Sequence, residues 1–202
     1  MGEGIQYGVQ FTKGDYLLFL NNDTEMITET ALSELLGCCM REDVGAVGAK
    51  LLYSDDTVQH AGVVIGFGGY AGHVNMGIKR DDYGYMVRAR INCNYSAVTA
   101  ACMMTKKSLF EQVGGFDEQF VVACNDVDYC LKIRELDKWV IYNAFSEWYH
   151  YESKSRGYED TPEKLKRCEV EKFQKKWPEI LEKGDPFYNP NFPINRAPFT
   201  WG

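Results

Sequence analysis

A short apolar run that ends abruptly in polar residues constrains this chain most. Residues 16–20 read Tyr-Leu-Leu-Phe-Leu, and Asn21, Asn22 and Asp23 follow directly. The run is too short for a helix of its own, so it predicts a strand buried on both faces in a parallel or mixed sheet. Ligands bind at the carboxyl ends of such strands, and a carboxylate flanked by amides suits a hard divalent cation. Asn-Asn-Asp is also typical of a plain turn, and this stretch alone leaves both interpretations open.

Strand and helix patterns alternate along the rest of the chain. Thr28 is the expected N-cap of a helix in which Leu32, Leu35, Leu36 and Met40 recur at helical spacing. Further strands are expected at 44–53, 58–67, 95–104 and 139–145, and further helices at 125–136 and 161–177. This order predicts an α/β fold in which helices flank a mixed sheet.

Charge and composition exclude several classes of protein. The 202 residues carry a formal net charge of −7, so nucleic-acid binding is not expected. No apolar run approaches the length of a membrane span, and the N-terminus lacks the regions of a signal peptide. Seven scattered cysteines without a Cys-x-x-Cys pair predict reduced thiols and a cytosolic protein. The 14% of aromatic residues fits a sugar-binding cleft, and equally a large core or an interface.

Two more polar groups follow apolar segments, at 125–128 (Asn-Asp-Val-Asp) and at 150–157. Each has an ordinary structural interpretation: Asp126 as a helix N-cap, Asp128 as a salt-bridge partner, and His150 as a hydrogen-bonded core histidine. Taken together, the groups supply a carboxylate and an imidazole for a divalent metal, a second carboxylate to accept a proton, and a Ser-x-Ser-Arg loop for phosphate. Such a set is suited to displacing a phosphorylated leaving group by an activated hydroxyl.

Four motifs in this order carry a family resemblance. They are Gly-Asp-Tyr-Leu-Leu-Phe-Leu-Asn-Asn-Asp-Thr-Glu at 14–25, Gly-Gly-Phe-Asp-Glu at 114–118, Asn-Asp-Val-Asp-Tyr-Cys-Leu at 125–131 and His-Tyr-Glu-Ser at 150–153. The chain resembles glycosyltransferase family 2, in particular the bacterial rhamnosyltransferase-like enzymes of cell-surface polysaccharide synthesis. The resemblance implies a GT-A fold, in which a Rossmann-like sheet binds a nucleotide-diphospho-sugar and an acceptor-binding half follows the metal motif.

The resemblance also implies roles on the donor side. Asp23, in the place of the family's Asp-x-Asp motif, would coordinate Mg²⁺ or Mn²⁺ together with His150. The donor diphosphate would contact a wider set of residues, namely Asn21, Asn22, Ser153, Ser155 and Arg156.

On the acceptor side, Asp126 matches the family's catalytic base. It would take the proton of a saccharide or lipid-linked saccharide hydroxyl as that oxygen attacks the anomeric carbon and inverts it. The residues expected to shape the acceptor side are Gly114, Gly115, Phe116, Asp117 and Asn125, and Trp148 is a candidate for stacking on a sugar ring.

The position of the metal motif bears on domain organisation. Family members have about three strand-helix units before this motif, and this chain has only about twenty residues there. We therefore expect a partial GT-A domain over 1–183, lacking the N-terminal part of the nucleotide-binding half, and an extended tail over 184–202. An exposed sheet edge would then allow a homodimer, and the site would lie in the cytoplasm, at the inner face of the membrane if it is membrane-associated. Two alternatives are a non-catalytic carbohydrate-binding or scaffold module of the same fold and a metal-dependent phosphohydrolase.

Overall fold

The computed structural model describes residues 2–121, 123–151 and 163–200 as an α/β fold. The elements in chain order are α1 Gly2–Val9, β1 Tyr16–Leu20, β2 Thr24–Met26, α2 Ala31–Cys39, β3 Val44–Leu52, β4 Val58–His60, β5 Val63–Ile65, the 3-10 turn η1 Phe67–Gly69, β6 Ala71–His73, the 3-10 turn η2 Tyr85–Val87, β7 Cys93–Asn94, β8 Cys102–Lys106, α3 Lys107–Gln112, α4 Asn125–Glu135, β9 Trp139–His150, α5 Glu163–Lys176 and α6 Pro178–Lys183. None of these helices is long and apolar enough to cross a lipid bilayer.

A seven-stranded mixed sheet organises the described part of the chain. Its order is β1-β8-β3-β9-β2, with β4 paired to β3 and β7 paired to β9, and β5 and β6 form a separate hairpin. β3 and β9 run parallel, whereas the other pairs in the large sheet are antiparallel. The predicted class, a mixed sheet flanked by helices, is therefore confirmed.

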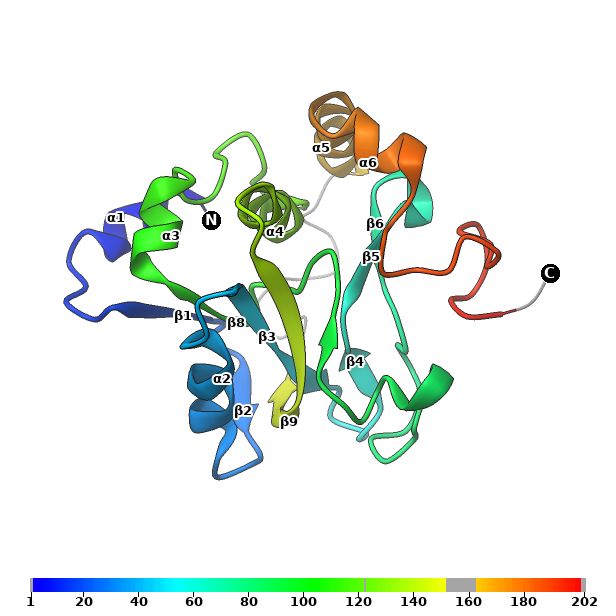
Figure 1. The fold of residues 1–202 in the computed structure, drawn as a ribbon, viewed down its shortest axis with the longest axis horizontal. Coiled ribbons are helices and arrows are strands. Elements are labelled where there is room, and N and C mark those ends of the chain that lie inside the picture. The colour runs from blue at the N-terminus through cyan, green and yellow to red at the C-terminus, as the bar shows by residue number, and fades with distance from the viewer. Residues whose placement is uncertain (1, 122, 152–162, 201–202) are drawn as a thin grey trace.

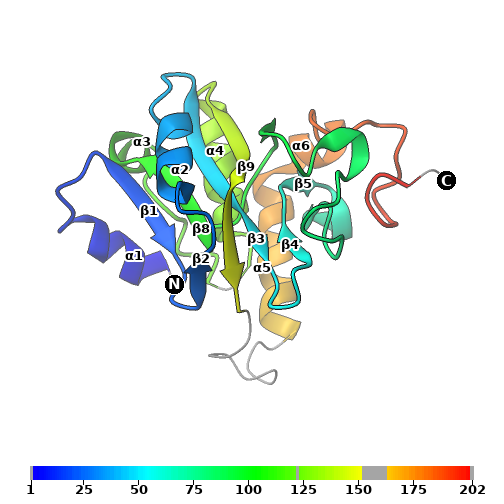
Figure 2. The same cartoon turned by 90° about the horizontal axis from the view of Figure 1, so that it is seen from below.

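Helices cover both faces of this sheet. Figures 1 and 2 show α3 and α4 on one face and α2 on the other. The core is accordingly divided into two apolar clusters: one, on the side of α3 and α4, includes Phe19, Phe116 and Tyr129, and the other, on the side of α2, includes Leu35 and Trp148. β3 lies between them and is buried along its whole length, as its unbroken small and apolar sequence predicts.

Several sequence expectations need correction. β1 spans the predicted residues but lies at an edge of the sheet, paired only with β8 among the described strands, so its side chains alternate in burial and Leu20 is 44% exposed. Thr28 does not cap α2, because the N-cap of this helix is Thr30. The Oγ1 of Thr28 instead accepts a hydrogen bond from the backbone N–H of Glu147 at 3.1 Å.

The single strand expected over 58–67 is divided into β4 and β5 at Gly62. This glycine has φ of 109°, and a Cβ there would lie 2.3 Å from the ring of Tyr95, so both the backbone and the packing exclude a side chain. β9 in turn extends from Trp139 to His150, five residues beyond the predicted end. Its extra length carries a histidine of the candidate site.

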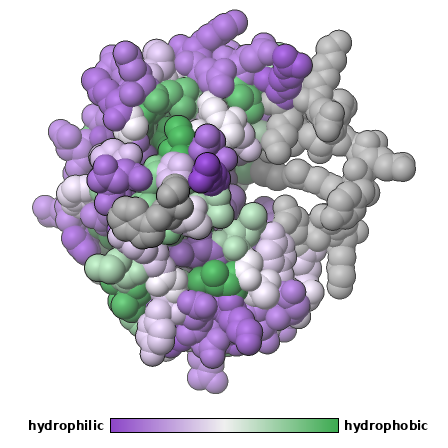
Figure 3. All heavy atoms as spheres, turned by 90° about the vertical axis from the view of Figure 1, so that its right-hand side faces the viewer, coloured by the Kyte–Doolittle hydropathy of each residue, from purple (hydrophilic) through white to green (hydrophobic). Residues whose placement is uncertain are grey.

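The segment after α6 has neither helix nor strand, yet it packs on the body through Tyr188 and Phe192, which are both buried. Asp185 anchors its start, because Oδ2 accepts the N–H of Ile65 at 2.7 Å. A cavity of about 1000 Å³ lies between this segment, α6 and β5, and none of the described site residues lines it. On the face that carries this segment, apolar patches lie between hydrophilic side chains (Figure 3).

Candidate functional site

The ends of β1 and β9 bring three predicted site residues together. Asn21 follows β1, His150 ends β9, and Thr24 of the short strand β2 pairs directly with His150. This pairing holds Asp23 against His150: the carboxylate Oδ1 lies 3.3 Å from the imidazole Nε2, and the two side chains are only 17% and 10% exposed. The Asn21 amide lies 3.0 Å from the same Nε2, although the two residues are 129 positions apart in sequence. Asn22 lies exposed in the turn between them.

A buried glutamine orients the histidine. Gln59 of β4 lies 2.6 Å from His150 Nδ1 through its Oε1, and its Nε2 donates to the His150 carbonyl at 3.3 Å. Oε1 can only accept, so this network assigns the proton to Nδ1 and leaves the lone pair on Nε2, which faces Asp23 and Asn21. Sequence reasoning missed Gln59; the available signal was a polar Gln-His pair at 59–60, between Val58 and the apolar run that begins at Ala61.

Asp126 lies in the first turn of α4, where Cys124 rather than Asp126 is the N-cap. Its carboxylate accepts two backbone hydrogen bonds, from Val127 N–H at 2.9 Å and from Ala100 N–H at 3.2 Å. The next residue, Ala101, accepts the N–H of Asn21 at 2.9 Å. Ala100 and Ala101 are adjacent, and they bind Asp126 and Asn21 respectively, so the same short backbone segment contacts both parts of the candidate site.

The remaining predicted residues have other environments. Phe116 is 1% exposed and its ring packs on Phe19 at 5.0 Å, so its side chain belongs to the core. Trp148 is 5% exposed, and its Nε1–H donates to Ser146 Oγ at 3.0 Å. The expectation that the Trp148 ring stacks on a sugar is therefore wrong, because α2 covers it. Ser153, Ser155 and Arg156 lie outside the described residues.

Charged side chains brace the loop before α4. Asp117 pairs with Lys176 at 2.6 Å. Burial is the largest single influence and raises the pKa of Asp117, but the hydrogen bonds from Lys176 and the Gln119 N–H, together with the charges of Lys176 and Lys132, outweigh it, and the pKa is lowered. Lys176 also reaches the fully buried Asp128 at 2.7 Å, which confirms the salt-bridge interpretation of Asp128. Gly114 and Gly115 have φ of 74° and 67°, which favours glycine at both positions. Asn125 is buried, and its Oδ1 accepts the N–H of its neighbour Asp126 at 2.8 Å.

The residues fit a divalent cation as far as the described chain extends. One carboxylate oxygen and one imidazole nitrogen converge, and no group of three or more His, Cys, Asp or Glu in the described ranges forms a fuller cage. Magnesium-type sites in nucleotide enzymes use one or two protein ligands and complete the shell with phosphate and water. The seven cysteines contribute no ligand of this kind and form no disulfide, as the sequence predicts.

Comparisons with known proteins give relatives much longer than this chain. No protein-family profile matches. The chain is 44% identical over 192 residues to the uncharacterized protein y4gI of Sinorhizobium fredii, matching 94% of this chain and 21% of that protein. It is 38% identical over 185 residues to the O-antigen biosynthesis protein RfbC of Myxococcus xanthus, matching 90% of this chain and 14% of that protein. The chain thus spans about a fifth and a seventh of the lengths of these two relatives.

Solved structures establish the fold. The mannosyltransferase PcManGT of Pyrobaculum calidifontis, solved with GDP-Man and Mn²⁺, matches 78% of this chain and 38% of its own, with a TM-score of 0.53 and 16% identity. GalNAc-T7, solved with UDP, GalNAc and Mn²⁺, matches 96% of this chain and 38% of its own, with a TM-score of 0.60 and 11% identity. At these identities the likeness shows the GT-A-like fold of the chain.

Proposed function

We propose that this chain belongs to a metal-assisted, inverting glycosyltransferase of family 2 that transfers a sugar from a nucleotide-diphospho-sugar to a saccharide hydroxyl. The observation that carries the proposal is the convergence of Asp23 Oδ1 and His150 Nε2 to 3.3 Å at the ends of β1 and β9. It is supported by the fold shared with two structures solved with nucleotides and Mn²⁺.

Asp23 and His150 are the residues that would hold Mg²⁺ or Mn²⁺. When bound there, the cation supplies positive charge that offsets the charge of the departing nucleoside diphosphate. Asn21 and Asn22 offer amide groups beside this position for the diphosphate oxygens. The two protein ligands leave the rest of the coordination shell to the diphosphate, which makes donor binding dependent on the metal.

Asp126 is the proposed general base. The backbone N–H groups of Val127 and Ala100 fix its carboxylate, so its orientation does not depend on the acceptor. In the transfer, the acceptor oxygen forms a bond to the anomeric carbon as the bond from that carbon to the diphosphate oxygen breaks, and the hydroxyl proton passes to Asp126. Attack from the side opposite the leaving group inverts the anomeric centre.

One relative supports the proposed class of acceptor. Similarity to an O-antigen biosynthesis protein supports a role in cell-surface polysaccharide synthesis, with a saccharide or a lipid-linked saccharide as acceptor. A lipid-linked acceptor would place the reaction at the inner face of the cytoplasmic membrane. Pairing of two copies through the open edge of β1 is proposed as the route to a homodimer.

Calorimetric titration with GDP and UDP in the presence of Mn²⁺ tests the donor site. We expect binding that requires the metal and is lost in Asp23→Asn, while Glu29→Gln, a matched change at an exposed acid six residues further on, leaves binding unchanged. Metal-independent binding, or equal binding by both variants, would contradict the proposal that Asp23 and His150 hold the metal.

A separate measurement tests the base. Asp126→Asn keeps the size of the side chain and one of its two backbone hydrogen bonds, because the amide nitrogen that replaces one carboxylate oxygen cannot accept the other, and the variant cannot take a proton. We expect unchanged metal and nucleotide binding and a fall in transfer, or in donor hydrolysis by this chain, of about a hundredfold or more. Retained turnover in this variant would show that another group is the base.

A further inference from the structure

The second half of β9 departs from regular sheet geometry. Ala49 of β3 pairs with Asn143, but the next residue, Lys50, pairs with Glu147, so residues 144–146 bulge out of the pairing. Asn143 holds the bulge: its Oδ1 accepts the N–H groups of Phe145 and Ser146 at 2.9 and 3.2 Å. Bulges of this kind commonly re-aim side chains beside functional sites.

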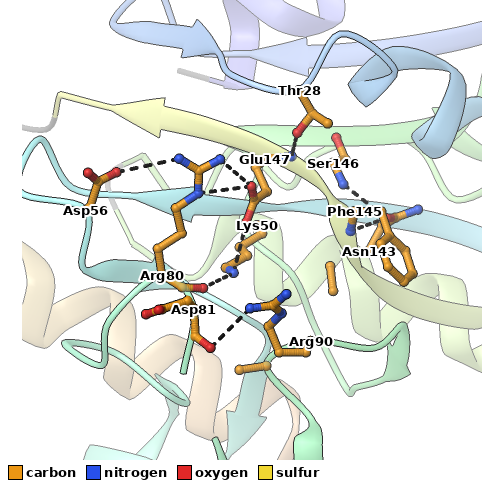
Figure 4. A network of polar contacts seen from close by, with 12 residues as sticks. Thr28, Lys50, Asp56, Arg80, Asp81, Arg90, Asn143, Phe145, Ser146 and Glu147 are labelled. Atoms are coloured by element: carbon orange, nitrogen blue, oxygen red, sulfur yellow. Dashed lines mark hydrogen bonds and ion pairs between the residues drawn. The ribbon is translucent and has the colours of Figure 1, made fainter. Parts of the chain in front are cut away.

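The bulge presents Phe145 to solvent at 52% exposure, an unusual position for a phenylalanine on a strand that is otherwise mostly buried. The ring lines a pocket of about 370 Å³ that it shares with Thr28, Arg80, Asp81 and Arg90. Figure 4 shows these side chains around the middle of β9. The lining is thus one aromatic ring among polar and charged side chains, a combination suited to a polar ligand that also has an apolar face.

Beneath the pocket, a buried ion network fixes the polar groups. Lys50 is 1% exposed and lies 3.0 Å from Glu147 Oε1, while Arg80 binds Glu147 Oε2 through Nε and Nη2 at 3.1 and 2.7 Å (Figure 4). Lys50 Nζ also donates to the Arg80 carbonyl at 2.6 Å. Arg80 is therefore held at the surface in one orientation rather than free to move.

Two tyrosines continue the same side of β9. Burial alternates from Phe145 onward, so Glu147 and Tyr149 share the partly exposed side while Trp148 and His150 are buried. Tyr149 stacks on Tyr151 with ring centroids 5.9 Å apart, and their hydroxyls donate to Asp56 and Glu25 at 2.6 Å each. The Tyr151 N–H donates to the Asp23 carbonyl at 2.8 Å, so the two tyrosines lie next to the proposed metal-binding residues Asp23 and His150.

We propose that this row, Phe145, Glu147, Tyr149 and Tyr151 with Arg80, which we call the β9 strip, binds a neutral oligosaccharide. Aromatic rings suit the C–H faces of sugar rings, and the fixed carboxylates and guanidinium suit their hydroxyls. The charges favour a neutral ligand over a polyphosphate, because the carboxylates of Glu147 and Asp56 pair with Arg80 and offset its charge. If the proposed function holds, this saccharide is the acceptor chain, which extends along β9 away from the transfer site. This assignment rests on the proposed function.

Saturation-transfer NMR with neutral hexasaccharides tests the strip, using maltohexaose, mannohexaose and chitohexaose as probes at millimolar concentration. We expect at least one of them to bind the wild type, with about a tenfold loss of affinity in Phe145→Ala. Phe145→Trp should keep binding, and Trp139→Ala should leave it unchanged, since Trp139 is an exposed aromatic (41%) at the other end of the same strand.

The outcomes separate this inference from the proposed function. Binding by none of the three probes, or equal binding by wild type and Phe145→Ala, overturns the strip. Saccharide binding that depends on Phe145 supports it even where metal-dependent nucleotide binding fails, in which case the transferase proposal falls while the strip stands. Thermal unfolding of Phe145→Ala, followed by circular dichroism, confirms that a loss of binding is not a loss of fold.

Discussion

Gln59 Oε1 lies 2.6 Å from His150 Nδ1, and this contact decides which nitrogen of the ring is available to a metal. With the proton held on Nδ1, the lone pair of Nε2 faces Asp23. Partners of this kind, which bind a ligand's other ring nitrogen, typically affect metal affinity by 10- to 100-fold. The polar residue that sets the chemistry of the pair thus comes from β4, a strand that carries none of the recognised motifs.

Gln59→Leu should weaken Mn²⁺ binding by about tenfold or more, because leucine removes the acceptor that fixes the ring. Mn²⁺ titration followed by electron paramagnetic resonance measures this affinity, and the ¹⁵N shifts of His150 report the tautomer directly. Gln10→Leu, at an exposed glutamine, is the matched control. A variant that keeps both the wild-type affinity and the Nδ1–H tautomer would show that Gln59 only fills space.

His60 should make stability depend on pH. It is fully buried, and burial, followed by the neighbouring His73 and His150, holds its pKa well below the ordinary value of 6.5. The unfolded chain therefore binds a proton at His60 below about pH 6.5 that the folded chain does not bind. The free energy of unfolding should fall as pH drops below that value, by up to about 1.4 kcal/mol per pH unit from this residue.

Urea unfolding at several pH values between 5 and 7.5, in EDTA, tests this dependence. His60→Gln should lower the slope of unfolding free energy against pH by about 1.4 kcal/mol per pH unit, the value for one proton, whatever its effect on absolute stability. Equal slopes for the two proteins would mean that His60 takes up its proton in the folded state.

Asp185 should determine whether the C-terminal segment stays attached. Its Oδ2 accepts the N–H of Ile65 and its Oδ1 the N–H of Phe187 at 2.8 Å, while burial raises its pKa. Asp185→Ala leaves these two N–H groups without their acceptor, a cost of about 1–3 kcal/mol for each group that stays buried. We expect faster chymotrypsin cleavage at Tyr188 than in Glu182→Ala, a change at an exposed acid of α6. Equal cleavage rates would show that the aromatic contacts alone hold the segment.

The sequence predicts those elements whose burial is uniform or whose ends are polar. β3, β1 and α4 have the expected bounds within about a residue, because an apolar run or a polar helix start marks each of them. The contacts that complete the site are long-range: Gln59 meets His150 across 91 positions. No local pattern encodes such a pairing, since it depends on β3 lying between β4 and β9.

The same reasoning explains the errors at aromatic residues. Trp148 and Phe145 are three positions apart, and the candidate for sugar stacking was the one that α2 buries. Alternation along β9 places these two residues on opposite sides, in agreement with the structure, but it does not say which side another element covers. The covered side is set by α2, which packs with Trp148 in one apolar cluster, and strand periodicity does not encode such a long-range contact.

The two acids of α4 should separate structure from catalysis. Asp128 is fully buried and bound by Lys176 at 2.7 Å and by Trp177 Nε1–H at 2.9 Å, whereas Asp126 is bound only by backbone N–H groups among its described contacts. Asp128→Asn removes one of the two carboxylates that pair with Lys176 and leaves Asp117 at 2.6 Å, so it should destabilise the protein by about 1–3 kcal/mol, the cost of losing a hydrogen bond to a buried charged group. Metal-dependent nucleotide binding should survive below the lowered melting temperature. Asp126→Asn should lose turnover with a smaller loss of stability, about that of one backbone hydrogen bond, because its carboxylate pairs with no cation among its described contacts that would be left uncompensated. If Asp128→Asn melted normally and lost turnover instead, the roles of the two acids would have to be exchanged.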